Sequence, residues 1–279
     1  VNYIISAYSD ESWMGNASNG FPGAYNQANL NFAQGGHVRV VMFECSGLEQ
    51  ATKIKNQIRQ IVGVGKPSVH TTDTPQEAWR NATIAFHDPT LKFFNTARIG
   101  AFNTFKIRHF VNETMRVVHG SDLELEDFCV GGSAPLALYG KRDCRDFDVV
   151  HLPSHNIPFT EKVSSHNDYL KYYVDDPRKI IFNPSKHIYV HGLKFLSIEG
   201  MVKMKSTRGE EKDIRDIQMA QEFLTTRFKN IVVLAAGPPK PNRNRHLETF
   251  KGKPLINNLL DECGVENTKA YVVVSKKNN

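Results

Sequence analysis

The chain has 279 residues, of which 40% are hydrophobic and 23% charged, a balance that excludes a disordered or fibrous protein. Because a single core rarely grows beyond roughly 250–300 residues, this length fits one large domain or two smaller ones. Thirty-five Lys and Arg residues against 29 Asp and Glu residues leave a net charge of +6, which mildly favours an anionic ligand such as a nucleotide.

The distribution of charged and apolar residues bears on partners and compartment. The basic residues are scattered, so we expect no nucleic-acid partner. No run approaches the roughly 18 apolar residues of a membrane span, and the first residues lack the pattern of a secretory signal. The four cysteines include no C-x-x-C pair, which indicates reduced thiols rather than a zinc site. We therefore predict a cytoplasmic protein with no membrane contact.

Residues 1–64 are predicted to form a strand-helix region before the main domain. The composition of residues 37–43, HVRVVMF, favours a strand. Apolar residues recur at helical spacing over residues 47–61 and predict a helix there. Residues 63–68 lack the Walker A spacing, which predicts a turn. Further on, Thr74 is expected to cap a helix, and the phenylalanines of residues 91–110 are expected in the core.

The clearest motif begins at Phe128 and reads FCVGGSAPLALYGKRDCRDFDVVHLP. It predicts a strand over residues 128–130, a tight turn, a helix over residues 134–139 and a second strand over residues 147–152. Asp146 and Asp148 stand two residues apart, so the period of a strand points both carboxylates to one face. Carboxylate oxygens suit Mg²⁺, and a glycine turn before a helix offers backbone N–H groups to a phosphate.

This block resembles the signature of the nucleotidyltransferase superfamily related to DNA polymerase β. Gly132 and Ser133 match the first half of that signature, and the Asp-x-Asp of Asp146 and Asp148 matches the second. The resemblance implies an α+β fold over residues 65–228, with a mixed sheet flanked by helices. It also implies transfer of a nucleoside monophosphate from an NTP to an acceptor, with Mg²⁺ held by the two aspartates.

Basic residues near the motif are the expected partners of the triphosphate. Lys141 and Arg142 lie in the loop between the turn and the second strand. Residues 187–217 resemble the end of the minimal, antitoxin-type nucleotidyltransferases, in which a lysine-bearing helix precedes a Lys-Asp-x-x-Asp helix. Lys205 takes the place of that lysine and completes the expected nucleotide-binding set. The residues that match the rest of this pattern are Arg208, Lys212, Asp213 and Asp216. The alternative for the last helix is a solvated charged face with Ile214 and Ile217 packed inward.

The family pattern also requires a third catalytic carboxylate on a neighbouring strand. Asp168 is the candidate by its order along the chain, and Glu199 is the second choice. Neither lies in a clear strand pattern, so the presence of a base for the acceptor hydroxyl stays open. The histidines of residues 151–191 show no ligand spacing, which favours surface or hydrogen-bonded core positions.

Residues 229–279 are predicted to form a short β-α-β unit, with apolar strands over residues 231–234 and 270–275 and a helix that begins at 252–256. The stretch resembles the start of the GT-A-type sugar-nucleotide pyrophosphorylases, through Gly237, Arg245 and Lys253. Such domains need many more residues, so we expect either a longer two-enzyme polypeptide or a structural appendage. Because this stretch directly follows the nucleotidyltransferase-like domain, we expect an acceptor from sugar or surface-glycan metabolism, such as a sugar phosphate.

Two other functions stay open from the sequence. One is a GT-A-like sugar-nucleotide or glycosyl-transfer protein in which the Asp-x-Asp binds a metal and a nucleotide-sugar. The other is a nucleotide-binding module without catalysis. The oligomeric state, the NTP and the acceptor are not encoded in any motif.

Overall fold

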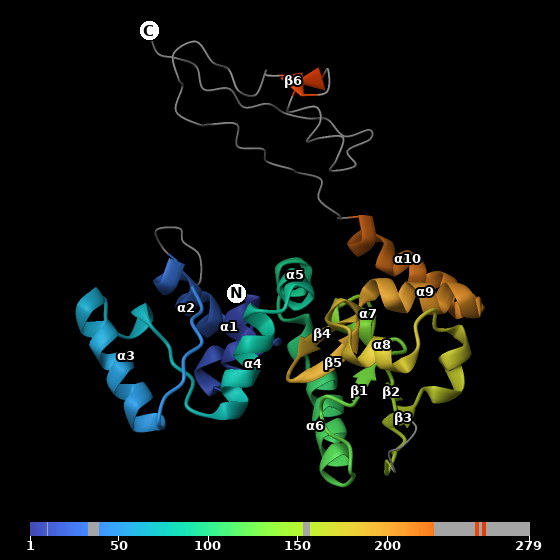
Figure 1. The fold of residues 1–279 in the computed structure, drawn as a ribbon, viewed down its shortest axis with the longest axis horizontal. Helices are drawn as coiled ribbons and strands as arrows, with labels where there is room; N and C mark the ends of the chain where they lie inside the picture. The colour runs from blue at the N-terminus through green and yellow to red at the C-terminus, as the bar shows by residue number, and fades with distance from the viewer. Residues whose placement is uncertain (10, 33–38, 153–156, 226–248, 251–252, 255–279) are drawn as a thin grey trace. The chain divides into compact units, whose positions relative to one another are not determined.

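The computed structural model describes residues 1–279 except residues 10, 33–38, 153–156, 226–248, 251–252 and 255–279 (Figure 1). The chain divides into two compact units, Val1–Leu224 and Thr225–Asn279. In the described part of the second unit, strands β6 (Thr249–Phe250) and β7 (Lys253–Pro254) form an antiparallel pair. The rest of this section concerns the first unit.

The first unit has an α+β fold, as predicted, built on a five-stranded mixed sheet in the order β3-β2-β1-β5-β4. The central pair β1 and β2 is antiparallel, whereas β1 pairs in parallel with β5 and β2 in parallel with β3. The edge strand β4 pairs antiparallel with β5. The strands are β1 (Phe128–Val130), β2 (Phe147–His151), β3 (Val163–Ser165), β4 (His187–Val190) and β5 (Leu193–Leu196).

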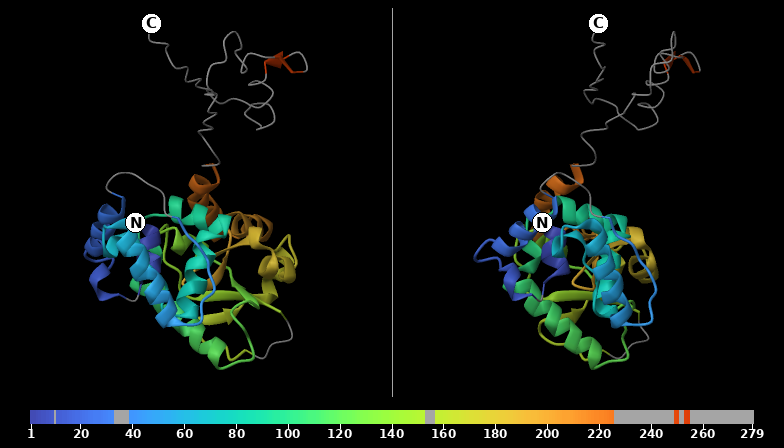
Figure 2. Two further views of the ribbon diagram at one scale, coloured as in Figure 1. Left: turned by 60° about the vertical axis from the view of Figure 1, so that its left-hand side comes forward. Right: turned by 90° about the vertical axis from the view of Figure 1, so that its left-hand side faces the viewer.

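Helices surround this sheet, and further helices from the N-terminal part of the chain extend beyond it. Figure 2 shows α6 on one side of the strands and the pair α9 and α10 on the other. The helices are α1 (Asn2–Ala7), α2 (Pro22–Phe32), α3 (Leu48–Val62), α4 (Pro75–Ala85), α5 (Asp88–Thr96), α6 (Phe105–His119), α7 (Ala134–Leu138), α8 (Pro177–Phe182), α9 (Ile198–Arg208) and α10 (Glu211–Thr225). Short 3₁₀ turns are η1 (Ser12–Met14), η2 (Lys66–Ser68), η3 (Ala101–Asn103), η4 (Asn167–Tyr172) and η5 (Pro184–Lys186).

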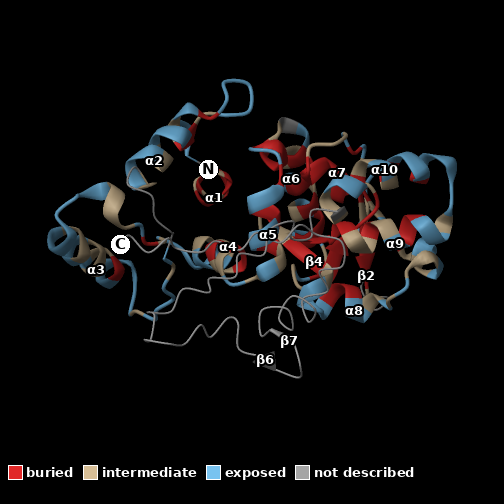
Figure 3. Cartoon of the chain, turned by 90° about the horizontal axis from the view of Figure 1, so that it is seen from above, coloured by how far each residue is buried: buried red, intermediate tan, exposed pale blue. Residues whose placement is uncertain are grey.

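One hydrophobic core joins the sheet to α5, α6 and α7. Buried residues gather around the strands and these helices, while α2 and α3 expose most of their surface (Figure 3). The core includes four of the predicted phenylalanines, Phe93, Phe94, Phe102 and Phe110. Phe93 and Phe102 pack edge to face, a geometry that aromatic rings favour over stacking. The aromatic segment is therefore core, as predicted.

Side-chain hydrogen bonds define where two of the helices begin. The Thr74 side chain accepts a hydrogen bond from the backbone N–H of Glu77 and caps α4, as predicted. Ser197 caps α9 in the same way, through the N–H of Gly200. Each cap satisfies a backbone donor that the first turn leaves without a partner, a contribution of about 1 kcal/mol.

The predictions for residues 1–64 have mixed outcomes. The predicted helix is confirmed as α3, and residues 66–68 form the turn η2. The predicted strand is wrong where it can be assessed, because residues 39–43 belong to no strand and the Val41 side chain is 77% exposed. A β-favouring composition forms a strand only when a second strand pairs with its backbone, and none does so here among the described residues.

The C-terminal prediction lies mostly outside the described residues, including both apolar strands, Gly237 and Arg245. One part can be corrected. The structure has a strand at Lys253–Pro254, where the sequence predicts the start of a helix. Lys253 pairs with Phe250 across the ladder, so its backbone groups are engaged between strands.

Two further findings concern the described part of the chain. No helix in it is both long and apolar enough to cross a membrane. Cys45, Cys129 and Cys144 are free thiols, as the spacing predicts.

Candidate nucleotide and metal site

The predicted motif forms a continuous unit of strand, glycine turn, helix and strand. β1 runs into the turn at residues 131–133, α7 follows, and the chain returns as β2 beside β1. The backbone N–H of Gly131 donates to the carbonyl oxygen of Asp148 at 2.6 Å, which ties the turn to β2. This bond explains how residues 17 positions apart come to lie together.

Gly132 lies directly against the Asp148 carboxylate. Its φ is +56°, a left-handed conformation that glycine adopts without strain. A Cβ at this position would stand 1.9 Å from Asp148 Oδ2, far inside van der Waals contact. The position therefore requires glycine for both conformation and space. The turn and the carboxylate that the sequence predicts in one site are indeed adjacent.

Both carboxylates of the Asp-x-Asp motif lie where burial disfavours their charged forms. Asp146 immediately precedes β2 and Asp148 lies within it. Burial, followed by the neighbouring charge of Asp148, raises the pKa of Asp146. Burial also raises the pKa of Asp148, although a hydrogen bond from Ser164 Oγ (3.4 Å to Oδ1) and the charge of Lys205 oppose this. A cation between the two groups would remove the repulsion.

The residue opposite Asp148 on β3 is not a carboxylate. The parallel pairing of β2 and β3 places Ser164 beside Asp148. Asp168, the predicted third acid, lies in the 3₁₀ turn η4 after β3 and is exposed. Glu199, the second choice, lies in the first turn of α9. Burial, followed by the charge of Glu199, raises the pKa of Tyr139. Among the described residues, no three His, Cys, Asp or Glu side chains form a group that could hold a metal ion.

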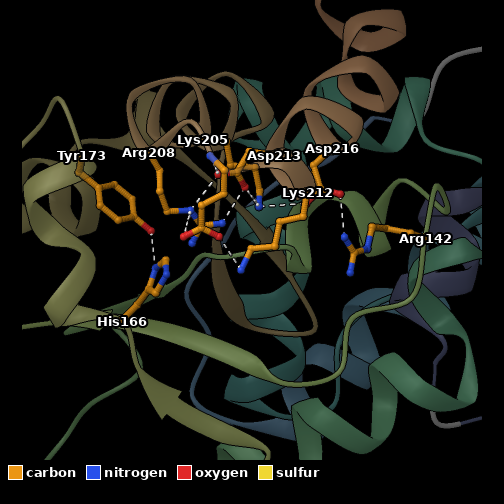
Figure 4. A network of polar contacts seen from close by, with 9 residues as sticks. Arg142, His166, Tyr173, Lys205, Arg208, Lys212, Asp213 and Asp216 are labelled. Atoms are coloured by element: carbon orange, nitrogen blue, oxygen red, sulfur yellow. Dashed lines mark hydrogen bonds and ion pairs between the residues drawn. The ribbon is translucent and has the colours of Figure 1, made fainter.

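Tyr173 closes the opposite side of the glycine turn. Its hydroxyl lies 2.8 Å from His166 Nδ1 (Figure 4). The same hydroxyl is also bonded to the backbone of Gly132. Burial, with the charges of Arg208 and Lys205, lowers the pKa of His166 to about 4, so the ring is neutral at pH 7. The Gly132 N–H can only donate, and the tyrosine hydroxyl therefore donates its own hydrogen to Nδ1.

Lys205 is enclosed in an ion-pair network between α9 and α10. The side chain is 3% exposed, and its Nζ lies 3.1 Å from Asp213 Oδ1 and 2.9 Å from Asp216 Oδ2. Arg208 also binds Asp213, with Nη2 at 2.6 Å from Oδ1. Figure 4 shows these side chains pointing toward one another. Lys205 therefore acts on Asp148 through its charge, and its ion pairs with Asp213 and Asp216 are buried.

Lys212 is the basic side chain of this cluster that reaches solvent. It is 64% exposed and lies 2.8 Å from Glu210 Oε2. Burial raises the pKa of Asp148, and the charge of Lys212 is among those that oppose this. The sequence names Lys212 only as part of the helical pattern, and exposure is what distinguishes it from Lys205 and Arg208.

The other two predicted nucleotide-binding residues lie after α7. Arg142 Nη1 donates to Asp216 Oδ1 at 2.7 Å, which joins this loop to the Lys205 network. Lys141 pairs with Glu222 and lies 5.2 Å from the centre of the Phe223 ring. The loop is thus held by α10. Ser133, the remaining predicted residue, immediately precedes α7, and its side chain makes no capping hydrogen bond.

His166, Tyr173 and Ser164 belong to the site but were not selected from the sequence. His166 is one of several histidines without ligand spacing, and Tyr173 follows a 3₁₀ turn with no motif. Their proximity to the glycine turn depends on how the chain returns after β3. The local signal nearest to them is the serine pair at residues 164–165, which ends β3 directly before His166.

Comparisons with protein-family models, curated proteins and solved structures find no match for this chain. The functional argument therefore stands on the geometry. The fold and the site define an α+β protein in which a glycine turn, a carboxylate pair and a basic cluster share one place. In proteins, carboxylates together with phosphate oxygens are the usual ligands of Mg²⁺.

Proposed function

We propose that this protein is a Mg²⁺-dependent nucleotidyltransferase that transfers a nucleoside monophosphate from an NTP to an acceptor. The observation that carries the proposal is the packing of Gly132 against Asp148, with Asp146 beside it. The turn and the start of α7 thus lie beside the place where two carboxylates repel each other. A phosphate and a cation would satisfy both features at once.

The donor set fits magnesium. Mg²⁺ is commonly held by one or two carboxylates, with phosphate and water oxygens completing its shell. Asp146 and Asp148 supply the carboxylates, and their raised pKa values mean that a cation stabilises their charged forms. When bound, the metal would neutralise the charge that develops on the leaving pyrophosphate.

The remaining groups of the site bind and orient. The N–H groups of Gly131 and Gly132 are already bonded to Asp148 and Tyr173, so phosphate oxygens would be met by the end of the turn at Ser133. The exposed Lys212 meets the triphosphate from the side of α10. Lys205 and Arg208 keep the surrounding potential positive from buried positions. The neutral His166 holds Tyr173 beside the turn, which limits the space there.

A second candidate function is nucleotide binding without transfer. The observation that favours it is Ser164, which stands opposite Asp148 on the neighbouring strand. A serine hydroxyl is a poor base for an acceptor hydroxyl, whereas a carboxylate could accept the proton. Asp168→Asn and Glu199→Gln test whether either acid takes this role in the complex. A loss of turnover with intact NTP binding would identify it as the third carboxylate.

The decisive experiment compares Asp146→Asn and Asp148→Asn with the wild type. Pyrophosphate release from each of the four NTPs is measured with Mg²⁺ and glucose 1-phosphate, a sugar-phosphate acceptor. We expect each change to reduce release about 100-fold or more, because the metal is worth several kcal/mol in such reactions. Asp73→Asn, an exposed aspartate before α4, is the control. Unchanged release in both site variants would refute the proposal.

Thermal shift separates the alternatives, since a ligand that binds the native state raises its melting temperature. A Mg²⁺-dependent shift with NTPs but no pyrophosphate release supports the binding module. A shift with a nucleotide-sugar and none with NTPs supports the GT-A-like alternative. The sugar or surface-glycan acceptor itself rests on residues outside those described, and pyrophosphate release with and without glucose 1-phosphate tests it.

A further inference from the structure

A cavity of about 630 Å³ lies at the C-terminal end of α7. The glycine turn is at the other end of the same helix, and neither Asp146 nor Asp148 lines the cavity. The segments that line it are residues 17–25, 98–107 and 137–144. The volume is in the range of small-molecule sites, roughly 300–1,000 Å³.

One wall of the cavity is apolar and shaped by glycine. Phe21, Ile99 and Ile107 line it, and Gly100 lets the Phe21 ring come close. Gly100 has a φ of +68°, and a Cβ there would stand 2.2 Å from that ring. Gly140 performs the same role, because its Cβ would stand 2.8 Å from the Ala101 methyl group. Close packing of this kind gives the wall a defined form.

The polar wall is strongly basic. Its charged residues are Arg98, Lys106, Lys141, Arg142 and Asp143, four cations and one carboxylate. Arg98 is exposed and has no carboxylate partner among the described residues. The carboxylate partners of Lys106 and Lys141 are themselves largely exposed, at 70% and 65%, where ion pairs are weak.

Arg142 is positioned before any ligand arrives. It lies in the polar wall and is held by the buried Asp216, which also binds Lys205. Asp216 is thus shared between Arg142 and Lys205, and Lys205 also pairs with Asp213. Arg142 keeps a fixed place and residual positive charge. Pre-organised cations of this kind bind phosphate through charge-assisted hydrogen bonds.

We propose that this cavity binds a small organic phosphate. The phosphate group lies among Arg98, Lys106 and Arg142, and the carbon skeleton lies against Phe21 and Ile107. The inference does not depend on nucleotide transfer, because none of these side chains belongs to the carboxylate pair. Sugar phosphates have the size and the polarity that the two walls require.

Binding of glucose 1-phosphate to the full chain, followed by calorimetry and thermal shift, tests this site. We expect Arg98→Ala and Lys106→Ala to weaken binding about tenfold each, which corresponds to about 1.4 kcal/mol. Both residues are exposed, so their removal leaves the fold intact. Lys53 on α3 is an exposed lysine that does not line the cavity. Lys53→Ala is the matched control and should bind glucose 1-phosphate as the wild type does.

Ligand comparison and a double variant locate the bound phosphate. Glucose should not bind, and inorganic phosphate should bind more weakly than glucose 1-phosphate, because each lacks one half of the ligand. The double variant Asp146→Asn, Asp148→Asn should keep its affinity even if it loses nucleotide transfer. Absence of binding, equal affinity for inorganic phosphate, or binding that Arg98→Ala and Lys106→Ala leave unchanged would each overturn the proposal. Loss of binding only in the double variant would place the ligand at the carboxylate pair and overturn it as well.

Discussion

Gly132 and Asp148 approach so closely that a single methyl group cannot be placed between them. A Cβ on Gly132 would stand 1.9 Å from Asp148 Oδ2 and 2.8 Å from Asp148 Cγ. The carboxylate is held on its other side by β3, through Ser164. The backbone turn and the carboxylate are thus one rigid unit, and changes at either residue should be felt by the whole site.

Gly132→Ala should destabilise the fold by about 2–5 kcal/mol, the sum of a left-handed backbone for alanine and a steric clash. Gly63→Ala provides the control, because Gly63 has a φ of +73° but nothing within 4 Å of its Cβ. That change should cost only about 1–2 kcal/mol. Urea unfolding of the two variants measures the difference. Equal losses would mean that the contact with Asp148 is absent.

Asp148→Asn should raise the melting temperature of the metal-free protein at pH 7. The folded state raises the pKa of this carboxyl, so it binds more protons than the unfolded state above pH 4, and its stability falls as pH rises through that window. The neutral amide has no such penalty. The advantage of the variant should disappear near pH 3, where the carboxyl is protonated. A constant difference between pH 3 and pH 7 would contradict this explanation.

Lys205→Met should cost about 3–5 kcal/mol, because it leaves Asp213 and Asp216 buried without their shared cation. Lys212→Met is the matched control on the same network. Its ion pair with Glu210 is exposed, so we expect a change of about 0–1 kcal/mol. Chemical unfolding at neutral pH checks both values. A small loss for Lys205→Met would show that the carboxylates find other partners.

The folded protein should lose stability as pH falls from about 6.5 to about 4. Burial lowers the pKa of His166 to about 4, helped by the charges of Arg208 and Lys205 and opposed by Asp146. The unfolded state therefore binds more protons in this window, and protonation favours it, by roughly 3 kcal/mol in total for this ring. His187, also with its pKa lowered to about 4 by burial, adds to the loss.

His166→Gln should make this acid-induced loss smaller, as measured by thermal unfolding between pH 7 and pH 4. The exposed His119 supplies the comparison, and His119→Gln should follow the wild-type curve. A His166→Gln curve with the wild-type slope would indicate that other groups cause the acid sensitivity. The comparison uses slopes, so the lost hydrogen bond to Tyr173 does not affect it.

Local patterns predicted the elements around the glycine turn well. β1, α7 and β2 lie within a residue or so of their expected bounds, since each is determined by interactions over a few residues. The strand predicted over residues 37–43 is wrong over its described part, residues 39–43, for the opposite reason. A strand needs a partner from elsewhere in the chain, and its own composition does not supply one.

α10 shows a case in which the hydrophobic pattern is wrong. The sequence offers Ile214 as an inward-facing residue, but its side chain is 55% exposed, while Asp213 is fully buried. The reason lies in another helix. Lys205 and Arg208 of α9 supply two cations to Asp213, and ion pairing makes its burial possible. No property of the α10 sequence by itself contains this information.

The sequence by itself determined the spacing of Asp146 and Asp148, the glycine turn before α7 and the α+β class of the fold. These features depend on the strand period, on glycine conformation and on helix capping, all of which act over short distances. Only the tertiary structure decided which groups surround the carboxylates. The parallel pairing of β2 with β3 placed Ser164 there instead of an acid. The packing of α9 against α10 buried Lys205 and left Lys212 in solvent, because burial of a charge requires partners that the fold brings from other elements.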